Sequence, residues 1–236
     1  MARRGAKPVG GTDPSPPAGL ASFRTPAPPD KLHVTLTPLA KGGVLHRVHQ
    51  GGYQADQFNP GVYGDARFSP IQDEHGKPIP TLYGGTTMAC ALMETVFHDV
   101  PHTAGFKSLD KGKLVGQVHS TVLVEQALQL VDLASVPLRR LGVTRKQLID
   151  TEKDQYPATR KWAEAIHRQC PQAQGLSWIS RQDDSARAVV LFGDRISDGA
   201  LRPGGGSRSL LDDADAYDSV LDLAERIGVN IVPGKS

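Results

Sequence analysis

The spacing of hydrophobic and polar positions changes several times along the chain. Alternating or wholly apolar runs predict β-strands over 33–37, 44–49, 81–83, 114–124, 128–134, 175–180, 188–192 and 229–232. Apolar residues at helical spacing predict helices over 87–98, 144–150, 159–169 and 211–227. The run over 188–192 is continuously apolar, so we expect it to be a buried central strand. Helices dispersed among strands, without an internal repeat, predict an α+β domain.

The helix predicted over 87–98 has the most unusual pattern. Its residues are nearly all apolar, which indicates burial, and Glu94 is its only fully charged residue. Cys90 and His98 lie one turn away on the same face. A carboxylate in that company is costly to ionise unless a cation or hydrogen-bond donors reach it. Glu94 is therefore a candidate site residue, and the alternative is a structural Glu–Arg pair that closes the fold.

The segments before this helix have the composition of turns. Gly84 and Gly85 predict a tight bend, and Thr86 or Thr87 can cap the first helical turn. Residues 71–80 are mostly hydrophilic and predict a solvated hairpin.

An arginine and a long loop lie further upstream. Arg47 is in the middle of the strand predicted over 44–49, where it either points inward at an anionic group or lies on the solvent face of an edge strand. Residues 50–66 are rich in Gly, Asn and Asp, which predicts a loop, and its three aromatic residues suit a cover over a pocket.

The composition is that of an ordinary single domain of 236 residues, with 39% hydrophobic and 22% charged residues. A net charge of +2 gives no reason to expect direct binding to nucleic acid or to a membrane surface. Cys90 and Cys170 form no metal-ligand or redox spacing, so we expect both to be packing residues in a reducing compartment. Pro101 separates His98 from His102, and no HExxH motif is present, so no metal site is expected.

Residues 1–30 differ from the rest because they hold seven prolines and four glycines. This composition predicts a flexible arm, with the packed domain over 31–236. No apolar run is long enough to span a bilayer, and no hydrophobic segment follows the basic start, so we expect a cytoplasmic protein.

Five short pieces of the chain, in order, resemble the RES-domain family, which is named for a dispersed Arg, Glu and Ser. The pieces are LHRVHQ with Arg47, DARFSP with Arg67, LYGGTTMACALMET with Tyr83 and Glu94, GLSWISRQ with Ser180, and AVVLFGDRI. The resemblance covers about residues 44–196, the expected core of a RES-like catalytic domain. The chain departs from the family in reading Arg-Phe-Ser at 67–69, where Arg-Trp-Asn is usual.

The resemblance implies a fold similar to that of ADP-ribosyltransferase toxins, with a mixed or antiparallel β core and flanking helices. It also implies a toxin that consumes NAD⁺ and that is neutralised by an antitoxin with an Xre-type (helix-turn-helix) domain. Hydrolysis, phosphorolysis and transfer of ADP-ribose to a protein are all attributed to family members. NAD⁺ is then a substrate, and no cofactor or metal is expected.

The residue types suit this chemistry. Arg47 and Arg67 can clamp the diphosphate of NAD⁺ through charge-assisted hydrogen bonds. Glu94 can stabilise the positive charge that develops on the ribose when nicotinamide leaves. Tyr83 can stack on nicotinamide, and Ser180 can bind its amide or orient Glu94. We therefore expect Glu94, Arg67 and Tyr83 to be catalytic and Arg47 and Ser180 to bind substrate.

Each assignment has an alternative in which the residue is structural. Tyr83 can be a core aromatic of a strand, Ser180 can cap the turn that follows it, and Arg67 can simply neutralise Glu94. At the level of function, we expect NAD⁺ cleavage by phosphorolysis or hydrolysis. The alternatives are a mono-ADP-ribosyltransferase that modifies a cellular protein and a non-catalytic module that binds a nucleotide or a partner.

Overall fold

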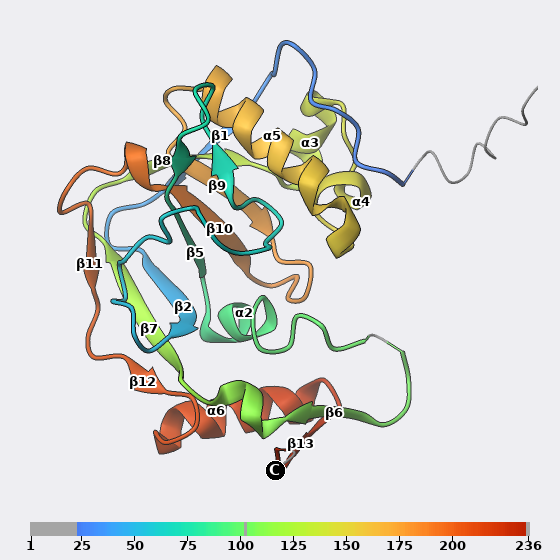
Figure 1. Ribbon diagram of the computed structural model, residues 1–236, viewed down its shortest axis with the longest axis vertical. Coiled ribbons are helices and arrows are strands. Elements are labelled where there is room, and N and C mark those ends of the chain that lie inside the picture. Colours follow the sequence, from blue (N-terminus) through green and yellow to red (C-terminus); the bar gives the residue numbers. More distant parts are fainter. Residues whose placement is uncertain (1–22, 102, 235–236) are drawn as a thin grey trace, which may run out of the picture.

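The computed structural model describes residues 23–101 and 103–234, which form one α+β domain around a mixed sheet (Figure 1). The strands are β1 (Leu36–Leu39), β2 (Val44–Gln50), β3 (Ile71–Gln72), β4 (Pro78–Ile79), β5 (Thr81–Gly85), β6 (Lys107–Asp110), β7 (Gln117–Val124), β8 (Leu128–Asp132), β9 (Gly175–Ile179), β10 (Arg187–Phe192), β11 (Leu201–Pro203), β12 (Arg208–Ser209) and β13 (Val229–Val232). The α-helices are α2 (Met88–Met93), α3 (Ser135–Leu141), α4 (Arg145–Leu148), α5 (Tyr156–Gln169) and α6 (Ala214–Arg226). Three short 3-10 helices are η1 (Lys111–Leu114), η2 (Lys153–Gln155) and η3 (Gly193–Arg195).

The main sheet has nine strands in the order β1-β8-β9-β10-β5-β2-β7-β11, with β12 also paired to β7. β8 and β9 are parallel, and the other neighbours are antiparallel. β10 lies between β9 and β5, and its residues 188–192 are all buried. The expected α+β fold with a mixed core and flanking helices is therefore confirmed, and so is the central buried strand.

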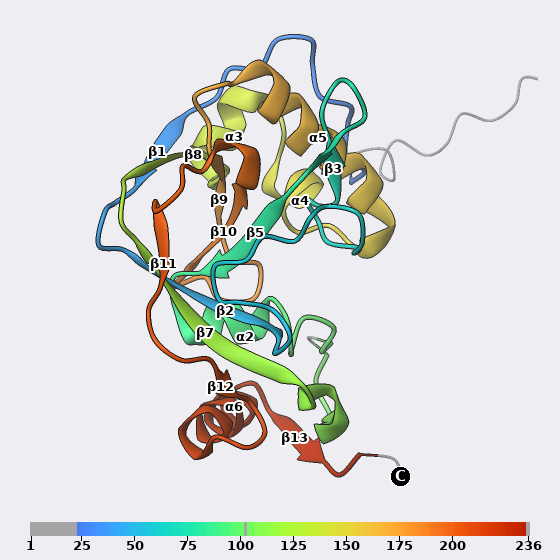
Figure 2. The same cartoon turned by 60° about the vertical axis from the view of Figure 1, so that its left-hand side comes forward.

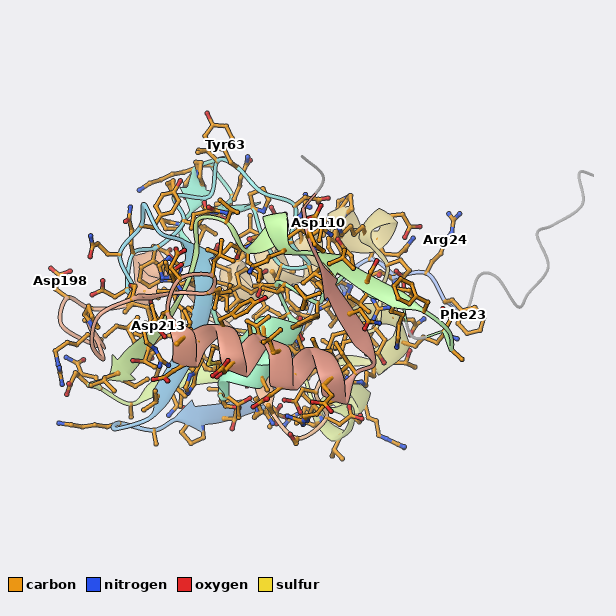
Figure 3. The ribbon with its side chains drawn as sticks, turned by 90° about the horizontal axis from the view of Figure 1, so that it is seen from below. Phe23, Arg24, Tyr63, Asp110, Asp198 and Asp213 are labelled. Atoms are coloured by element: carbon orange, nitrogen blue, oxygen red, sulfur yellow. The ribbon has the colours of Figure 1, made fainter. Side chains whose placement is uncertain are left out.

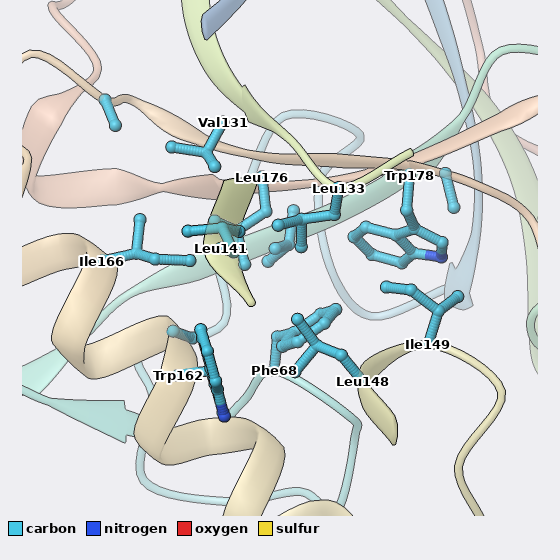
Figure 4. Close-up of a cluster of buried hydrophobic side chains, with 14 of the residues drawn as sticks. Phe68, Val131, Leu133, Leu141, Leu148, Ile149, Trp162, Ile166, Leu176 and Trp178 are labelled. Atoms are coloured by element: carbon cyan, nitrogen blue, oxygen red, sulfur yellow. The ribbon is translucent and has the colours of Figure 1, made fainter. Parts of the chain in front are cut away.

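The largest hydrophobic cluster lies between α5 and the sheet (Figure 4). Trp162 and Ile166 of α5 face Leu176 and Trp178 of β9, and Phe68 fills the space between them. Each of these side chains is at most 1% exposed. Full burial of one such side chain contributes about 1.5–3 kcal/mol relative to leaving it exposed. The apolar stripe predicted for this helix is therefore what fixes α5 on the sheet.

A second cluster joins α2 to α6 at the other end of the molecule. Leu92 and Phe97 pack with Val220 and Ala224 of α6, and each is at most 2% exposed. In two views α3, α4 and α5 gather at one end, α6 lies at the other, and α2 lies between them (Figure 1, Figure 2). The short helix α2 is thus held on both sides.

The helix predicted over 87–98 is shorter than expected, because α2 ends at Met93. Glu94 is its C-cap residue, and the Glu94 backbone N–H donates a hydrogen bond to the carbonyl oxygen of Cys90. The Thr95 hydroxyl donates to the carbonyl of Ala91 at 2.6 Å, and Phe97 N–H turns back to the carbonyl of Leu92. This turn buries Phe97 against α6, so tertiary packing ends the helix before the local apolar pattern does.

The packed chain begins before the expected boundary at Lys31. Trp162 Nε1 donates to the carbonyl of Pro26 at 2.7 Å, and the Thr25 hydroxyl donates to the carbonyl of Gln147 at 2.6 Å. Phe23 lies at the edge of the domain, with Lys146 Nζ 3.6 Å from its ring centroid (Figure 3). Residues 1–22 of the expected arm lie outside the described residues.

Other expectations differ in detail. Residues 71–80 do form a hairpin through β3 and β4, but Ile71 and Ile79 are buried, while Gln72 and residues 74–77 are exposed. Helix α3 and strand β6 were not expected, while Cys90 and Cys170 are buried free thiols, as expected of packing residues. Within residues 23–101 and 103–234, no helix combines the length and the apolar character that crossing a membrane requires.

Candidate active site

A cavity of about 380 Å³ opens between β2, β5, the end of α2 and the start of α5. Four of the five predicted site residues, Arg47, Arg67, Tyr83 and Glu94, line it. They come from separate segments that the sheet brings together. Ser180, the fifth, lies behind Glu94 and does not line the cavity.

The turn from β5 into α2 places Glu94. A Cβ atom at Gly85 would lie 2.9 Å from Cys90 Sγ, so only glycine allows the helix to approach the strand this closely. Thr87 is the N-cap, and its hydroxyl accepts from Cys90 N–H at 3.0 Å, which confirms the predicted cap. Thr86 instead accepts from Arg187 N–H and ties the turn to β10.

Glu94 is anchored by a buried serine. Its side chain is 16% exposed, and the Ser180 hydroxyl donates to Glu94 Oε1 at 2.7 Å. Ser180 is fully buried and also accepts from Gln182 N–H and Asp183 N–H, both at 3.1 Å. It therefore both orients Glu94 and caps the turn, two of the roles considered from the sequence. The third, direct contact with a substrate, does not fit its position behind the carboxylate.

Arg67 is a buried cation whose hydrogen-bonding capacity is largely unused. Its side chain is 4% exposed, and Nη1 lies 3.9 Å from Glu94 Oε2, a long ion pair. Among the described residues, neither Nε nor Nη2 has a hydrogen-bond partner. The ring of Tyr156 lies 5.7 Å from the guanidinium. Because an unpaired buried donor is costly, this arrangement is typical of a group that receives an anion from outside the chain.

Arg47 has a different environment from Arg67. It points inward from β2, an interior strand, and is 9% exposed, so the solvent-face alternative is wrong. Its guanidinium donates to the carbonyl oxygens of Ala55 and Gln57 and so anchors the loop that follows β2. Burial lowers the pKa of Arg47 to about 10, which leaves it charged at neutral pH. Arg47 therefore shapes the cavity wall and adds positive charge to it.

Tyr83 is an aromatic residue of strand β5 that also lines the cavity. Its ring lines the cavity and packs edge-on against Trp178, with the centroids 6.3 Å apart. Its hydroxyl accepts from Phe68 N–H at 3.0 Å, and burial raises its pKa to about 12. The phenol therefore stays protonated and serves as a fixed aromatic wall.

Several cavity residues were missed by the sequence analysis: His98, Asp99, Lys153 and Tyr156. His98 had been considered only as a metal ligand. Tyr156 begins α5, far along the chain, and its hydroxyl lies 3.1 Å from His98 Nε2. The adjacent His98-Asp99 pair was the only local signal, since nothing in the sequence indicates that α5 starts beside it.

His46, which lines the cavity, forms a neutral pair with His119 behind it. His46 Nδ1 lies 3.0 Å from His119 Nε2, and the planes of the two stacked rings are 15° from parallel. Burial lowers the pKa of both side chains, that of His119 to about 4, and the positive charge of Arg208 acts in the same direction. At neutral pH this pair adds no charge to the cavity.

The fold and the cavity define the class: a single-domain α+β protein with a carboxylate and a buried arginine side by side in one cavity. The model of the RES domain matches residues 44–209, more than half of the chain, and includes every predicted site residue. The chain therefore belongs to the RES-domain family, as its resemblance had indicated. At a coarse level, membership supports a toxin-like domain that uses NAD⁺. A comparison with curated proteins found no match.

Proposed function

We propose that this protein cleaves the nicotinamide–ribose bond of NAD⁺ and passes the ADP-ribosyl group to water or to phosphate. One observation carries the proposal. The oriented carboxylate of Glu94 lies 3.9 Å from Arg67 in one cavity, and no described residue pairs with Nε or Nη2 of that arginine. A carboxylate suits a developing positive charge on the ribose, and a guanidinium with free donors suits phosphate oxygens. NAD⁺ contains both the ribose on which this charge develops and the phosphate oxygens.

The departure of nicotinamide needs little help from the protein. The nicotinamide ring of NAD⁺ is positively charged and leaves as a neutral molecule, so its nitrogen takes the bonding electrons without protonation. The ribose becomes oxocarbenium-like, and Glu94 stabilises that charge while Ser180 fixes the carboxylate. Tyr83 provides an aromatic face for the nicotinamide ring. Arg67, with Arg47 in the same cavity wall, attracts the diphosphate.

The products identify the acceptor. Purified protein is incubated with NAD⁺ with and without inorganic phosphate, and the products are read by mass spectrometry. Free ADP-ribose indicates hydrolysis, and an ADP-ribose carrying one more phosphate indicates phosphorolysis. A label found only on protein indicates the mono-ADP-ribosyltransferase alternative. Intact NAD⁺ in every sample contradicts cleavage and leaves the non-catalytic binding module.

A toxin of this kind requires a neutralising partner, and an Xre-type antitoxin is the partner that we propose. Support comes from the family and from the cavity, which a partner segment can block. Expression of the chain alone should deplete cellular NAD⁺ and stop growth. Coexpression of a neighbouring helix-turn-helix protein should restore both, whereas growth that is unaffected by the chain alone contradicts the toxin role.

A further inference from the structure

Three side chains at the rim of the cavity form a continuous hydrogen-bonded chain, which we call the Asp99–His98–Tyr156 relay. His98 Nδ1 lies 2.9 Å from Asp99 Oδ1, and His98 Nε2 lies 3.1 Å from the Tyr156 hydroxyl. All three residues line the cavity that contains Glu94. The relay starts at an exposed carboxylate, 59% exposed, and ends at a buried phenol, 2% exposed. It therefore connects the interior of the cavity with solvent.

The charges around the relay fix the direction of its hydrogen bonds. Hydrogen bonds from His98 and then from Lys153 hold the pKa of the Asp99 carboxyl below its ordinary value, so Asp99 is ionised at neutral pH. An ionised carboxylate only accepts, so His98 carries its proton on Nδ1. In the neutral ring Nε2 is then the acceptor, and it lies in position for the hydrogen bond of the Tyr156 hydroxyl.

The inner end of the relay lies next to the groups proposed to bind NAD⁺. The Tyr156 ring is 5.7 Å from the guanidinium of Arg67, which in turn lies 3.9 Å from Glu94. The negative charge of Glu94 and the positive charges of Arg67 and Arg181 all act on the Tyr156 phenol. Its pKa is raised, chiefly by burial, so a free tyrosinate does not accumulate.

From this geometry we infer that the Asp99–His98–Tyr156 relay is a general base that deprotonates a neutral acceptor, water or a hydroxyl group, as it attacks the ribose. The inference rests on the proposed function and deepens it, because it assigns the site to acceptors that must lose a proton. A phosphate dianion needs no such base.

The step balances in atoms and electrons. The acceptor oxygen forms a bond to the anomeric carbon of the ribose, and the carbon–nitrogen bond to nicotinamide breaks with its electron pair on nitrogen. The acceptor proton passes to the Tyr156 oxygen as the phenol proton passes to His98 Nε2. The resulting imidazolium is stabilised by Asp99 and returns its proton to solvent.

The relay also has a purely structural interpretation, as a clamp that joins the turn after α2 to the start of α5. Lys153 Nζ binds Asp99 at 2.9 Å, and Gln182 donates to the carbonyl of His98 at 3.4 Å. Glu152 and Arg181, beside the relay, pair with each other at 2.6 Å, and the exposed carboxylate of Asp65, which also lines the cavity, pairs with Arg160. A test must therefore separate loss of a base from loss of a clamp.

The test compares a neutral and an anionic acceptor on the same variants. His98→Gln keeps a polar side chain but cannot take up a proton, and Tyr156→Phe removes the phenol. His75→Gln and Tyr63→Phe are matched controls on exposed residues. Rates of NAD⁺ cleavage are measured in water alone and with added azide, an anion that attacks without losing a proton and gives ADP-ribosyl azide.

We expect His98→Gln and Tyr156→Phe to lower kcat for hydrolysis about 100-fold, the usual contribution of a general base, with little change in KM. The rate with saturating azide should stay within a few fold of wild type in both variants.

Other outcomes overturn the inference in distinguishable ways. Equal losses with water and with azide identify a clamp, and unchanged hydrolysis in both variants removes the relay from the reaction. If wild type uses phosphate as its only acceptor, the role of the relay as a general base is contradicted, but the proposed cleavage of NAD⁺ still holds. If wild type cleaves no NAD⁺ with any acceptor, the proposed function fails first.

Discussion

Two regions of the molecule contain the same set of side chains, an arginine and a histidine–aspartate pair, and use them differently. At η3, Arg195 donates to the carbonyl oxygens of Cys170 and Ala173 at 2.7 Å each, and to that of His167. At the cavity, Arg67 is buried with Nε and Nη2 unpaired among the described residues. The first arginine fastens a loop to the end of α5, and the second is a buried lining residue of the cavity with two donors that no described residue satisfies.

The two histidine–aspartate pairs differ in the same way. His167 Nε2 lies 2.9 Å from Asp194 Oδ2, and the His167 ring packs edge-on against Phe192. His98 is the same distance from Asp99, but its other nitrogen faces the hydroxyl of Tyr156 in the cavity wall. The same type of polar side chain can therefore be structural where its hydrogen bonds hold the fold together, and available for chemistry where it lines a cavity.

The arginine comparison gives the largest expected effect. Arg67→Lys keeps the charge but loses the planar fork, so we expect NAD⁺ cleavage to fall about 100-fold while stability changes little. Arg195→Lys loses hydrogen bonds to three carbonyl groups, so the free energy of unfolding should fall by about 2–4 kcal/mol with kcat nearly unchanged. Denaturant titration measures the stability of both variants and steady-state kinetics measures their activity, so the two opposite effects can be compared.

Arg168→Lys on the exposed face of α5 is the matched control for both. If Arg67→Lys and Arg195→Lys lose stability and activity in the same proportion, the contrast between a binding arginine and a structural one is wrong.

A smaller effect concerns acid stability, which must be known before any pH–rate profile is interpreted. His119 is 3% exposed, and its pKa of about 4 lies below the value near 6.5 of an unfolded histidine. Between these values the unfolded chain binds a proton that the folded chain does not. The free energy of unfolding should therefore fall by about 2–4 kcal/mol as the pH drops from 6.5 to 4.

Urea titrations at pH 7.5, 5.5 and 4.5 measure this loss, and His119→Gln should be less sensitive to acid over the same range. His75→Gln, on an exposed turn, should behave like wild type. A wild-type stability that is flat across the window contradicts the burial argument for His119.

The smallest expected effect separates two helix caps. Thr87 caps α2, which carries Glu94, and Thr144 caps α4, where Gln147 Oε1 accepts a reciprocal hydrogen bond from Thr144 N–H. Replacement of either threonine by alanine should cost about 1 kcal/mol of unfolding free energy. Thr87→Ala should also lower kcat several fold because the turn that aims Glu94 loosens. Equal activity of the two variants in a kinetic assay would show that the position of Glu94 does not depend on its cap.

Much of the fold could be predicted because it depends on local patterns. The buried strand over 188–192, the apolar stripe of α5 and the cap at Thr144 follow from spacing and residue type, and the structure contains all three. The end of α2 could not be predicted in this way. The apolar pattern continues to Phe97, but packing against α6 turns the chain at Glu94.

The candidate site was predicted in part, for a related physical reason. Glu94 and Arg67 each stood out as charged residues in segments of the family pattern, and the fold places them 3.9 Å apart. Ser180 was expected to bind the nicotinamide amide or to orient Glu94, and its hydroxyl donates to Glu94. Tyr156 was missed because its role depends on where α5 begins relative to His98, a long-range contact that leaves no trace in local spacing.

The most direct test of the account is the release of free nicotinamide from NAD⁺ by purified protein, followed by mass spectrometry. Glu94→Gln is compared with Glu225→Gln, the same substitution on the exposed face of α6. The account predicts release by wild type and by Glu225→Gln, and a rate lower by about 10³-fold for Glu94→Gln, since a group that stabilises transition-state charge contributes on that scale. No release by wild type, or equal release by all three proteins, would contradict it.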